Sequence, residues 1–178
     1  KNLYNKLDKF FNISYKPQFK EKDLKNLFDF EYIFTNPNMS KIKFDKSFLV
    51  KCNKLKAICT ASTGTNHVDL NYIKKNKIKL IYCPPSTLIR PLSKRLKKTK
   101  IEVGAQNCHH SYDFGANTGQ VNSRMLKSVG AKYLIIGHSE NRQLGESDKL
   151  INLKIKSAIR SGLKIIFCIG ETLREKKN

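Results

Sequence analysis

The sequence predicts an α/β protein built on a parallel sheet, and three observations support this. Short apolar runs rich in Ile, Val, Tyr and Phe alternate with segments of helical periodicity. Gly104, Gly137 and Gly170 mark the ends of three such runs and recur every 33 residues, the length of a strand-helix unit. Polar residues follow these runs, as they do at the carboxyl edge of parallel sheets.

The elements are expected in alternating order. In the first half we expect strands at residues 31–35, 55–60 and 77–82, and helices near 24–28, 47–53 and 68–75. In the second half we expect helices at 87–98, 121–129 and 148–161, and strands at 100–107, 133–136 and 163–171. Three strand-helix units in series predict part of a (β/α)8 barrel, of which about four units fit in this length.

The charge is strongly positive, with 35 Lys and Arg against 14 Asp and Glu and a net charge of +21. Only six of the basic residues are Arg, and the lysines are spread along the chain. Dedicated nucleic-acid surfaces combine Arg clusters with interleaved aromatic residues, so a general bias in composition is favoured over nucleic-acid binding. Anionic small substrates would also be attracted.

The cysteines indicate a reducing environment. The five are widely spaced, without a C-x-x-C pair or a signal peptide, which argues against a disulfide framework or a zinc ribbon and for the cytoplasm. Metal ligands by type crowd one loop (Cys108, His109, His110 and Asp113), but without a spaced partner pair a surface loop is favoured, so no metal is assigned. No apolar run has the length of a membrane span, and the missing initiator Met indicates a fragment.

The stretch at residues 133–142 carries the strongest chemical signal. Four apolar residues lead into Gly137, and His138, Ser139 and Glu140 follow at once. This is typical of a buried strand that ends in an active-site loop. A serine-hydrolase elbow would need a second Gly two residues after Ser139, where the sequence has Asn141, so that interpretation is weak.

A second candidate site lies at Ser62, Thr63 and Gly64. A Gly-containing turn after a strand can direct backbone N–H groups toward an anion, although an ordinary strand-helix connection is the alternative. Residues 56–70 resemble the substrate-domain loop of the D-2-hydroxyacid dehydrogenases, especially the phosphoglycerate dehydrogenase branch, in which this loop helps to hold the substrate carboxylate. The likeness covers about residues 28–81. The chain contains no G-x-G, so a complete NAD-dependent enzyme of this family is excluded.

From residue 82 onward five ordered motifs resemble the triosephosphate isomerase family: Cys83-Pro84-Pro85-Ser86, Gly104-Ala-Gln-Asn107, Gly115-Ala-Asn-Thr-Gly119, Ile136-Gly-His-Ser-Glu140-Asn-Arg142 and Cys168-Ile-Gly-Glu171. The resemblance implies interconversion of dihydroxyacetone phosphate and glyceraldehyde 3-phosphate through an enediolate, with no cofactor. It makes His138 the electrophile, with Glu140 beside it as a proton shuttle or a salt-bridged structural residue. Ser139 is expected to cap the helix and to contact the substrate. Thr118 matches the loop tip that the family inserts into a neighbouring subunit, which implies a homodimer.

Departures from the family pattern limit this expectation. The family's substrate-binding Lys lies in an Asn-x-Lys on the first strand, but the Asn-x-Lys here, Asn152-Leu153-Lys154, falls in an expected helix. The chain has no Glu-Pro for the catalytic base, and a full barrel needs about 250 residues. We therefore expect two truncated lobes, joined in a strand over residues 77–85, and no activity of this chain by itself. Residues 1–81 are expected to form a parallel α/β lobe of flavodoxin- or Rossmann-like type, and residues 82–178 the partial barrel. Two alternatives stay open: a hydroxyacid-dehydrogenase fragment, and a non-catalytic basic protein that binds anions or nucleic acid.

Overall fold

A computed structural model describes residues 21–36, 42–62 and 64–169 and shows one sheet of six parallel strands in the order β1-β2-β3-β4-β5-β6. The strands are β1 (Tyr32–Thr35), β2 (Ala57–Ala61), β3 (Lys79–Cys83), β4 (Ile101–Ala105), β5 (Tyr133–Ile136) and β6 (Lys164–Phe167). The helices are η1 (Glu21–Leu27), α3 (Lys46–Leu49), α4 (Leu70–Lys75), α5 (Ser86–Arg95), α6 (Ser123–Ser128), α7 (Ser139–Gln143) and α8 (Asp148–Arg160).

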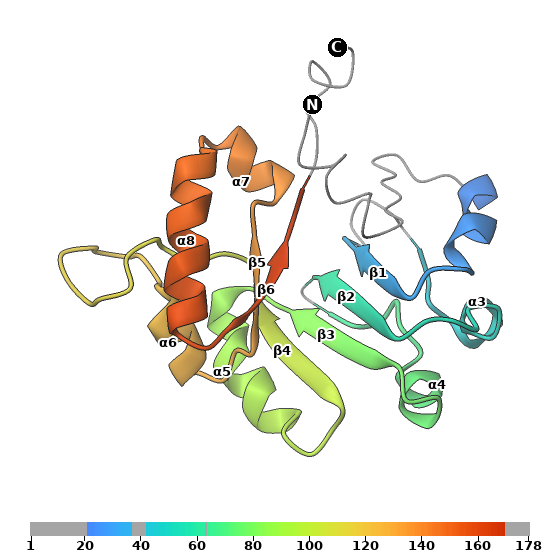
Figure 1. Ribbon diagram of the computed structural model, residues 1–178. Coiled ribbons are helices and arrows are strands. Elements are labelled where there is room, and N and C mark those ends of the chain that lie inside the picture. Colours follow the sequence, from blue (N-terminus) through green and yellow to red (C-terminus); the bar gives the residue numbers. More distant parts are fainter. Residues whose placement is uncertain (1–20, 37–41, 63, 170–178) are drawn as a thin grey trace, which may run out of the picture.

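The sheet is curved like part of a barrel wall, with helices on its outer side (Figure 1). Strands that follow one another along the chain are neighbours in the sheet, which is the order of a (β/α)8 barrel rather than of a doubly wound sheet. The curvature brings the end of β1 close to the residues after β5, where the rings of Phe34 and His138 lie 6.3 Å apart between centroids. The expected α/β class and partial barrel are confirmed.

Three groups of buried side chains hold the fold together. One packs η1, α3 and α4 against β1–β3 around Phe44, Phe48 and Leu80. A second packs α5, α6 and α8 against β4–β6 around Leu126 and Leu134. A third lies on the inner face of the curve: Cys59, Ile81, Cys83, Tyr133 and Ile135. All four residues of β5 are buried. Side chains on one face of the strand pack against the helices, and those on the other face pack on the inner side of the curved sheet. A strand buried on both faces has an unbroken apolar run in its sequence.

Side-chain caps define where several helices begin. Asp45, Asp69, Asn122 and Ser147 each accept a hydrogen bond from the backbone N–H three residues later, so one donor of each first turn is satisfied. Gly130 and Gly162 follow α6 and α8 with φ of 102° and 71°, the left-handed conformation that ends many helices. The expected caps at Ser147, Gly130 and Gly162 are confirmed.

Three local expectations need correction. The segment near residues 24–28 is a 3-10 helix, because this tighter coil places Leu24 and Leu27 on one face against the core. The helix expected at 47–53 is the single turn Lys46–Leu49. Ser139 does not cap α7, because His138 occupies the N-cap position and its own side chain accepts from the Glu140 N–H.

Some expectations fall outside the described residues, namely Thr63 of the candidate anion loop and the end of the last motif at Gly170 and Glu171. Within the described part of the chain, no helix is long and apolar enough to span a bilayer.

Candidate active site

The polar residues that follow the strands in the sequence lie along the carboxyl edge of the sheet. Because all six strands are parallel, Thr60 at the end of β2, Asn107 beyond β4 and His138 beyond β5 lie toward the same edge. Edges of this kind carry the active groups of barrel enzymes, and His138 is the residue with the clearest chemical role among them.

Gly137 sets the backbone from which His138 projects. Its φ of 76° lies in the left-handed region that only Gly adopts at low cost. A Cβ added there would lie 3.0 Å from both the Cys168 carbonyl oxygen and the Phe167 ring. The Gly137 carbonyl accepts a hydrogen bond from Arg142 Nε at 2.8 Å, and Arg142 Nη1 lies 2.7 Å from Asp148 Oδ1. These contacts hold the turn between β5 and α7.

His138 is oriented by the first turn of α7. Its Nδ1 accepts a hydrogen bond from the Glu140 N–H at 3.4 Å, a long contact, so in the neutral ring the proton lies on Nε2. The side chain is 16% exposed, whereas the neighbouring Glu140 is 64% exposed with Oε2 3.6 Å from Nδ1. The ring therefore has one nitrogen occupied by the helix start and the other available as a hydrogen-bond donor.

Phe34 completes the immediate surroundings of His138. It comes from β1, on the far edge of the sheet, and its ring is inclined at 59° to the imidazole at 6.3 Å. No local sequence pattern indicates this neighbour, because the contact depends on how far the whole sheet curves.

A buried polar network lies behind the site. Lys154 Nζ on α8 pairs with Glu146 Oε1 and donates to Asn107 Oδ1 at 3.0 Å, and Asn107 Nδ2 donates to Glu146 Oε1 at 2.8 Å. The Lys154 and Glu146 side chains are 7% and 10% exposed. This network was not foreseen, although the position of Lys154, three residues after Ile151 and four before Ala158 on the apolar face of α8, was a usable signal. The Asn-x-Lys ending at Lys154 thus lies in a helix, as expected.

The family model described as triosephosphate isomerase matches residues 50–178, well over half of the chain. The chain belongs to the triosephosphate isomerase family. It is 42% identical over 106 residues to the triosephosphate isomerase of Alkaliphilus oremlandii, covering 59% of this chain and 42% of that protein. It is 46% identical over 101 residues to the enzyme of Carboxydothermus hydrogenoformans, covering 56% and 40%.

A solved structure agrees with these relatives. The triosephosphate isomerase of Bartonella henselae superposes with a TM-score of 0.60 at 37% identity, covering 68% of this chain and 54% of that one. The chain thus covers only about two fifths of the length of the curated relatives described above. A second model, the catalytic domain of D-isomer specific 2-hydroxyacid dehydrogenases, matches residues 2–88, which supports the resemblance of the N-terminal part to that family.

The dehydrogenase-like loop directs its hydroxyl groups inward. Thr60 Oγ1 lies 3.1 Å from His67 Nε2 and 3.2 Å from Ser62 Oγ, and Ser62 Oγ donates to the Gly64 carbonyl at 2.7 Å. Thr60 and Ser62 are buried, and desolvation lowers the pKa of His67. The side chains of Thr60, Ser62 and His67 therefore bond within the loop, and Thr63 lies outside the described residues.

The remaining candidates lie on the loop between β4 and α6. Thr118 is exposed in a turn before Gly119, whose φ is 78°. The rings of His109 and His110 lie 4.1 Å apart, and desolvation, with a contribution from His110, lowers the pKa of His109. Among the described residues no group of three His, Cys, Asp or Glu side chains is arranged to hold a metal ion.

Proposed function

We propose that His138 is the electrophile of a triosephosphate isomerase site, acting on dihydroxyacetone phosphate and glyceraldehyde 3-phosphate. The observation that carries this proposal is the bond from the Glu140 N–H to His138 Nδ1. A neutral imidazole so held presents Nε2–H as a donor. It would stabilise the oxyanion that develops on the substrate carbonyl while a carboxylate removes the proton from the adjacent carbon, giving the enediolate.

The reaction also needs a base that removes the proton. The family's base lies in a Glu-Pro pair, which this sequence does not contain. The Glu140 carboxylate lies beside His138, on the Nδ1 side rather than on the donor side of the ring. We therefore propose that Glu140 positions His138 and that this 178-residue chain alone does not turn over triose phosphate.

Nitrogen NMR of His138 tests the electrophile proposal. Long-range ¹⁵N–¹H correlation spectra at pH 8, assigned by loss of the signal in His138→Gln, should show a neutral ring protonated on Nε2. A ring protonated on Nδ1, or a charged ring at that pH, would contradict the proposal, because neither matches a neutral donor on the substrate side.

We also propose that the chain forms a homodimer through the loop that carries Thr118, as the family resemblance implies. Thr118→Arg should lower the sedimentation coefficient from dimer to monomer, whereas Ser128→Arg, an exposed position on α6, should leave it unchanged. A monomeric unmodified chain would refute this proposal.

The five cysteines are all free, which supports a reducing compartment, and we propose that the protein lies in the cytoplasm.

A second candidate function concerns the N-terminal part alone. The dehydrogenase model over residues 2–88 favours a hydroxyacid-dehydrogenase lobe, and we propose that residues 1–81 derive from one and residues 82–178 from the isomerase. The inward hydrogen bonds of Thr60 and Ser62 argue against substrate binding by those hydroxyls. Reduction of hydroxypyruvate by NADH in the presence of the purified chain tests this candidate, and we expect none.

A further inference from the structure

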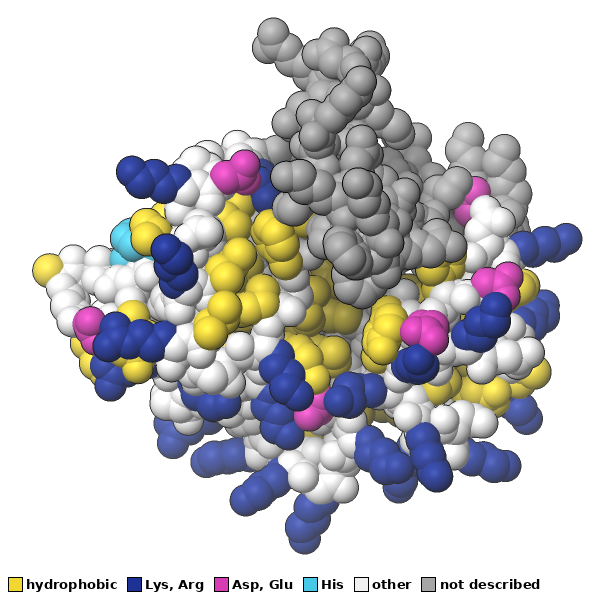
Figure 2. Space-filling view, viewed as in Figure 1, with side chains coloured by type: hydrophobic (Ala, Val, Ile, Leu, Met, Phe, Trp, Pro, Cys, Tyr) yellow, Lys and Arg dark blue, Asp and Glu magenta, His cyan; other side chains and the backbone are white. Residues whose placement is uncertain are grey.

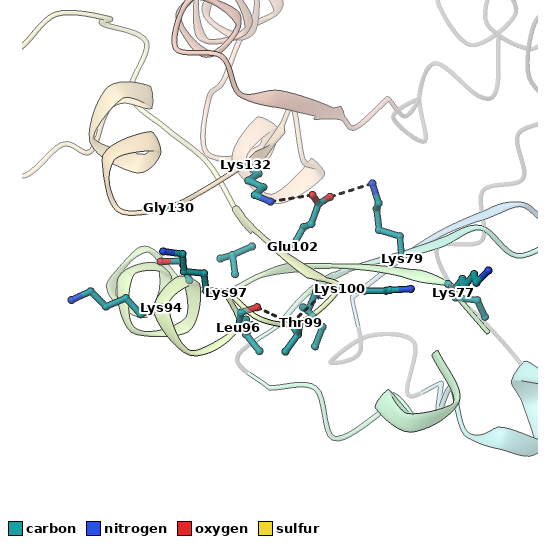
Figure 3. Close-up of a pocket in the computed structure, with 14 residues that line it drawn as sticks. Lys77, Lys79, Lys94, Leu96, Lys97, Thr99, Lys100, Glu102, Gly130 and Lys132 are labelled. Atoms are coloured by element: carbon teal, nitrogen blue, oxygen red, sulfur yellow. Dashed lines mark hydrogen bonds and ion pairs between the residues drawn. The ribbon is translucent and has the colours of Figure 1, made fainter. Parts of the chain in front are cut away.

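A second concave site lies at the amino-terminal edge of the sheet, opposite the edge that carries His138. It is a cavity of about 530 Å³ between the start of β3, the start of β4, the end of α5 and the connection before β5 (Figure 3). Space-filling shows Lys and Arg side chains gathered along the lower side of the molecule, where β4 begins (Figure 2). We call this cavity the lysine groove.

The lining of the lysine groove carries far more positive than negative charge. Glu102 is its one carboxylate, against six lysines: Lys77, Lys79, Lys94, Lys97, Lys100 and Lys132. Two of these lysines, Lys79 and Lys132, each lie 3.3 Å from a Glu102 oxygen. The other four make no ion pair with any residue in the described ranges, so most of the positive charge of the groove is uncompensated by the protein.

Glu102 holds two ammonium groups at the centre of the groove. Burial alone would raise the pKa of Glu102, but Tyr133, Lys79 and Lys132 beside the carboxylate outweigh burial and lower it, so the carboxylate stays charged. The same pairing raises the pKa of Lys79. In Figure 3 Lys94 and Lys97 lie at one side, on the end of α5, Lys77 lies at the other side, and Lys100 lies between them. Their flexible stems can turn toward an anion placed between them.

Lys77, which lines the groove, has an unfavourable backbone conformation. It follows the C-cap of α4 with φ of 58°, where helices commonly place Gly, and the Ile78 N–H bonds back to the Ile73 carbonyl as in that motif. Among the described residues it is the one non-glycine with positive φ. A Lys at such a position costs stability that a Gly would not.

The rest of the lining indicates the class of ligand. Its uncharged walls are mainly aliphatic (Ile78, Leu96, Ile101 and Val103), and it contains neither Arg nor an aromatic ring. Nucleic-acid surfaces depend on stacking and on Arg contacts along an extended strip. A compact anion with several charges needs only several flexible ammonium groups within reach of one cavity. From this geometry we propose that the lysine groove binds a small oligophosphate.

Titration calorimetry of the full chain with inorganic triphosphate tests the proposal. Binding should weaken at least about fivefold in the double variant Lys97→Gln, Lys100→Gln. The control Lys149→Gln, Lys156→Gln removes the same charge from exposed positions on α8 and should change affinity by less than about twofold. Equal weakening in both variants, or no binding by the unmodified chain, would overturn the proposal. So would a heteropolymeric single-stranded DNA that binds more tightly than triphosphate.

Two further variants separate this site from folding and from the isomerase site. Lys77→Gly should raise the melting temperature yet weaken triphosphate binding, a combination that loss of structure cannot produce. His138→Gln should leave triphosphate affinity unchanged, because His138 lies at the other edge of the sheet.

A comparison with adenosine triphosphate shows whether a nucleoside contributes to binding. Equal affinities for triphosphate and adenosine triphosphate would show that the groove recognises the phosphates alone. Tighter binding of adenosine triphosphate would show that the nucleoside also contacts the aliphatic wall.

Discussion

The ring of Phe34 lies 6.3 Å from the ring of His138, although Phe34 belongs to β1 and His138 follows β5. The part of the chain that the dehydrogenase model matches therefore contributes a neighbour to His138, the proposed electrophile. This contact links the two parts across the curve of the sheet, beyond the strand pairing between β3 and β4.

Removing Phe34 should loosen that link. Phe34→Ala should lower the free energy of unfolding by roughly 1–2 kcal/mol, since the side chain is 41% exposed and only part of its burial is lost. Urea denaturation measures the loss. The neighbouring Tyr32, 66% exposed on the same strand, gives the control, and Tyr32→Ala should cost less. Equal losses would show that the contact with His138 contributes nothing specific.

Gly137→Ala should disturb the turn that carries His138. The left-handed φ and the 3.0 Å approach to the Cys168 carbonyl together predict a loss of at least about 2 kcal/mol. Gly145 has φ of 100° but open space around its Cβ position, so Gly145→Ala should cost only about 1 kcal/mol. Thermal denaturation of both variants makes the comparison, and a larger loss at Gly145 would refute the close-packing argument.

Removing one charge of the buried pair of Glu146 and Lys154 should cost more stability than removing both. Glu146→Gln leaves the Lys154 charge buried without its counter-ion and should cost roughly 3–5 kcal/mol. The double variant Glu146→Leu, Lys154→Met removes both charges and should cost less than Glu146→Gln alone. The exposed pair of Lys54 and Asp29 is the control, because Lys54→Ala should cost under about 1 kcal/mol. A double variant that is less stable than Glu146→Gln would contradict this account.

Alkaline pH should destabilise the chain through its buried thiols. Burial raises the pKa of Cys52 and of Cys108 from 9.0 to about 11. The folded state thus binds protons more tightly than the unfolded state, so the thiols stabilise it below pH 9 and that stabilisation is lost as pH rises toward 11. Unfolding free energies measured from pH 8 to 11 should fall less steeply in Cys52→Ala, Cys108→Ala. An unchanged slope would show that other groups dominate.

Much of this fold could be predicted from the sequence, because the strands are short apolar runs and the caps are local. Asn122 and Ser147 begin helices through bonds to residues three positions away, which a linear pattern can reveal. The His138 turn was likewise visible, since an apolar run ending in Gly and polar residues is a local signal.

The remaining features depend on distant parts of the chain. Phe34 reaches His138 only through the curvature of six strands, and Asn107 meets Lys154 across two strand-helix units. The lysine groove likewise combines residues of α5 with the starts of β3 and β4, and in a chain of net charge +21 no linear pattern separates its lysines from the others. The cap at His138 was missed because Ser is the commoner capping residue.

We propose that this chain orients His138 as the electrophile of a triosephosphate isomerase and does not by itself catalyse the reaction. The most direct test is turnover of glyceraldehyde 3-phosphate by the purified chain, measured beside His138→Gln. We predict that both rates equal the uncatalysed background. Turnover by the unmodified chain that disappears in His138→Gln would contradict the claim, because it would require a working base among these 178 residues.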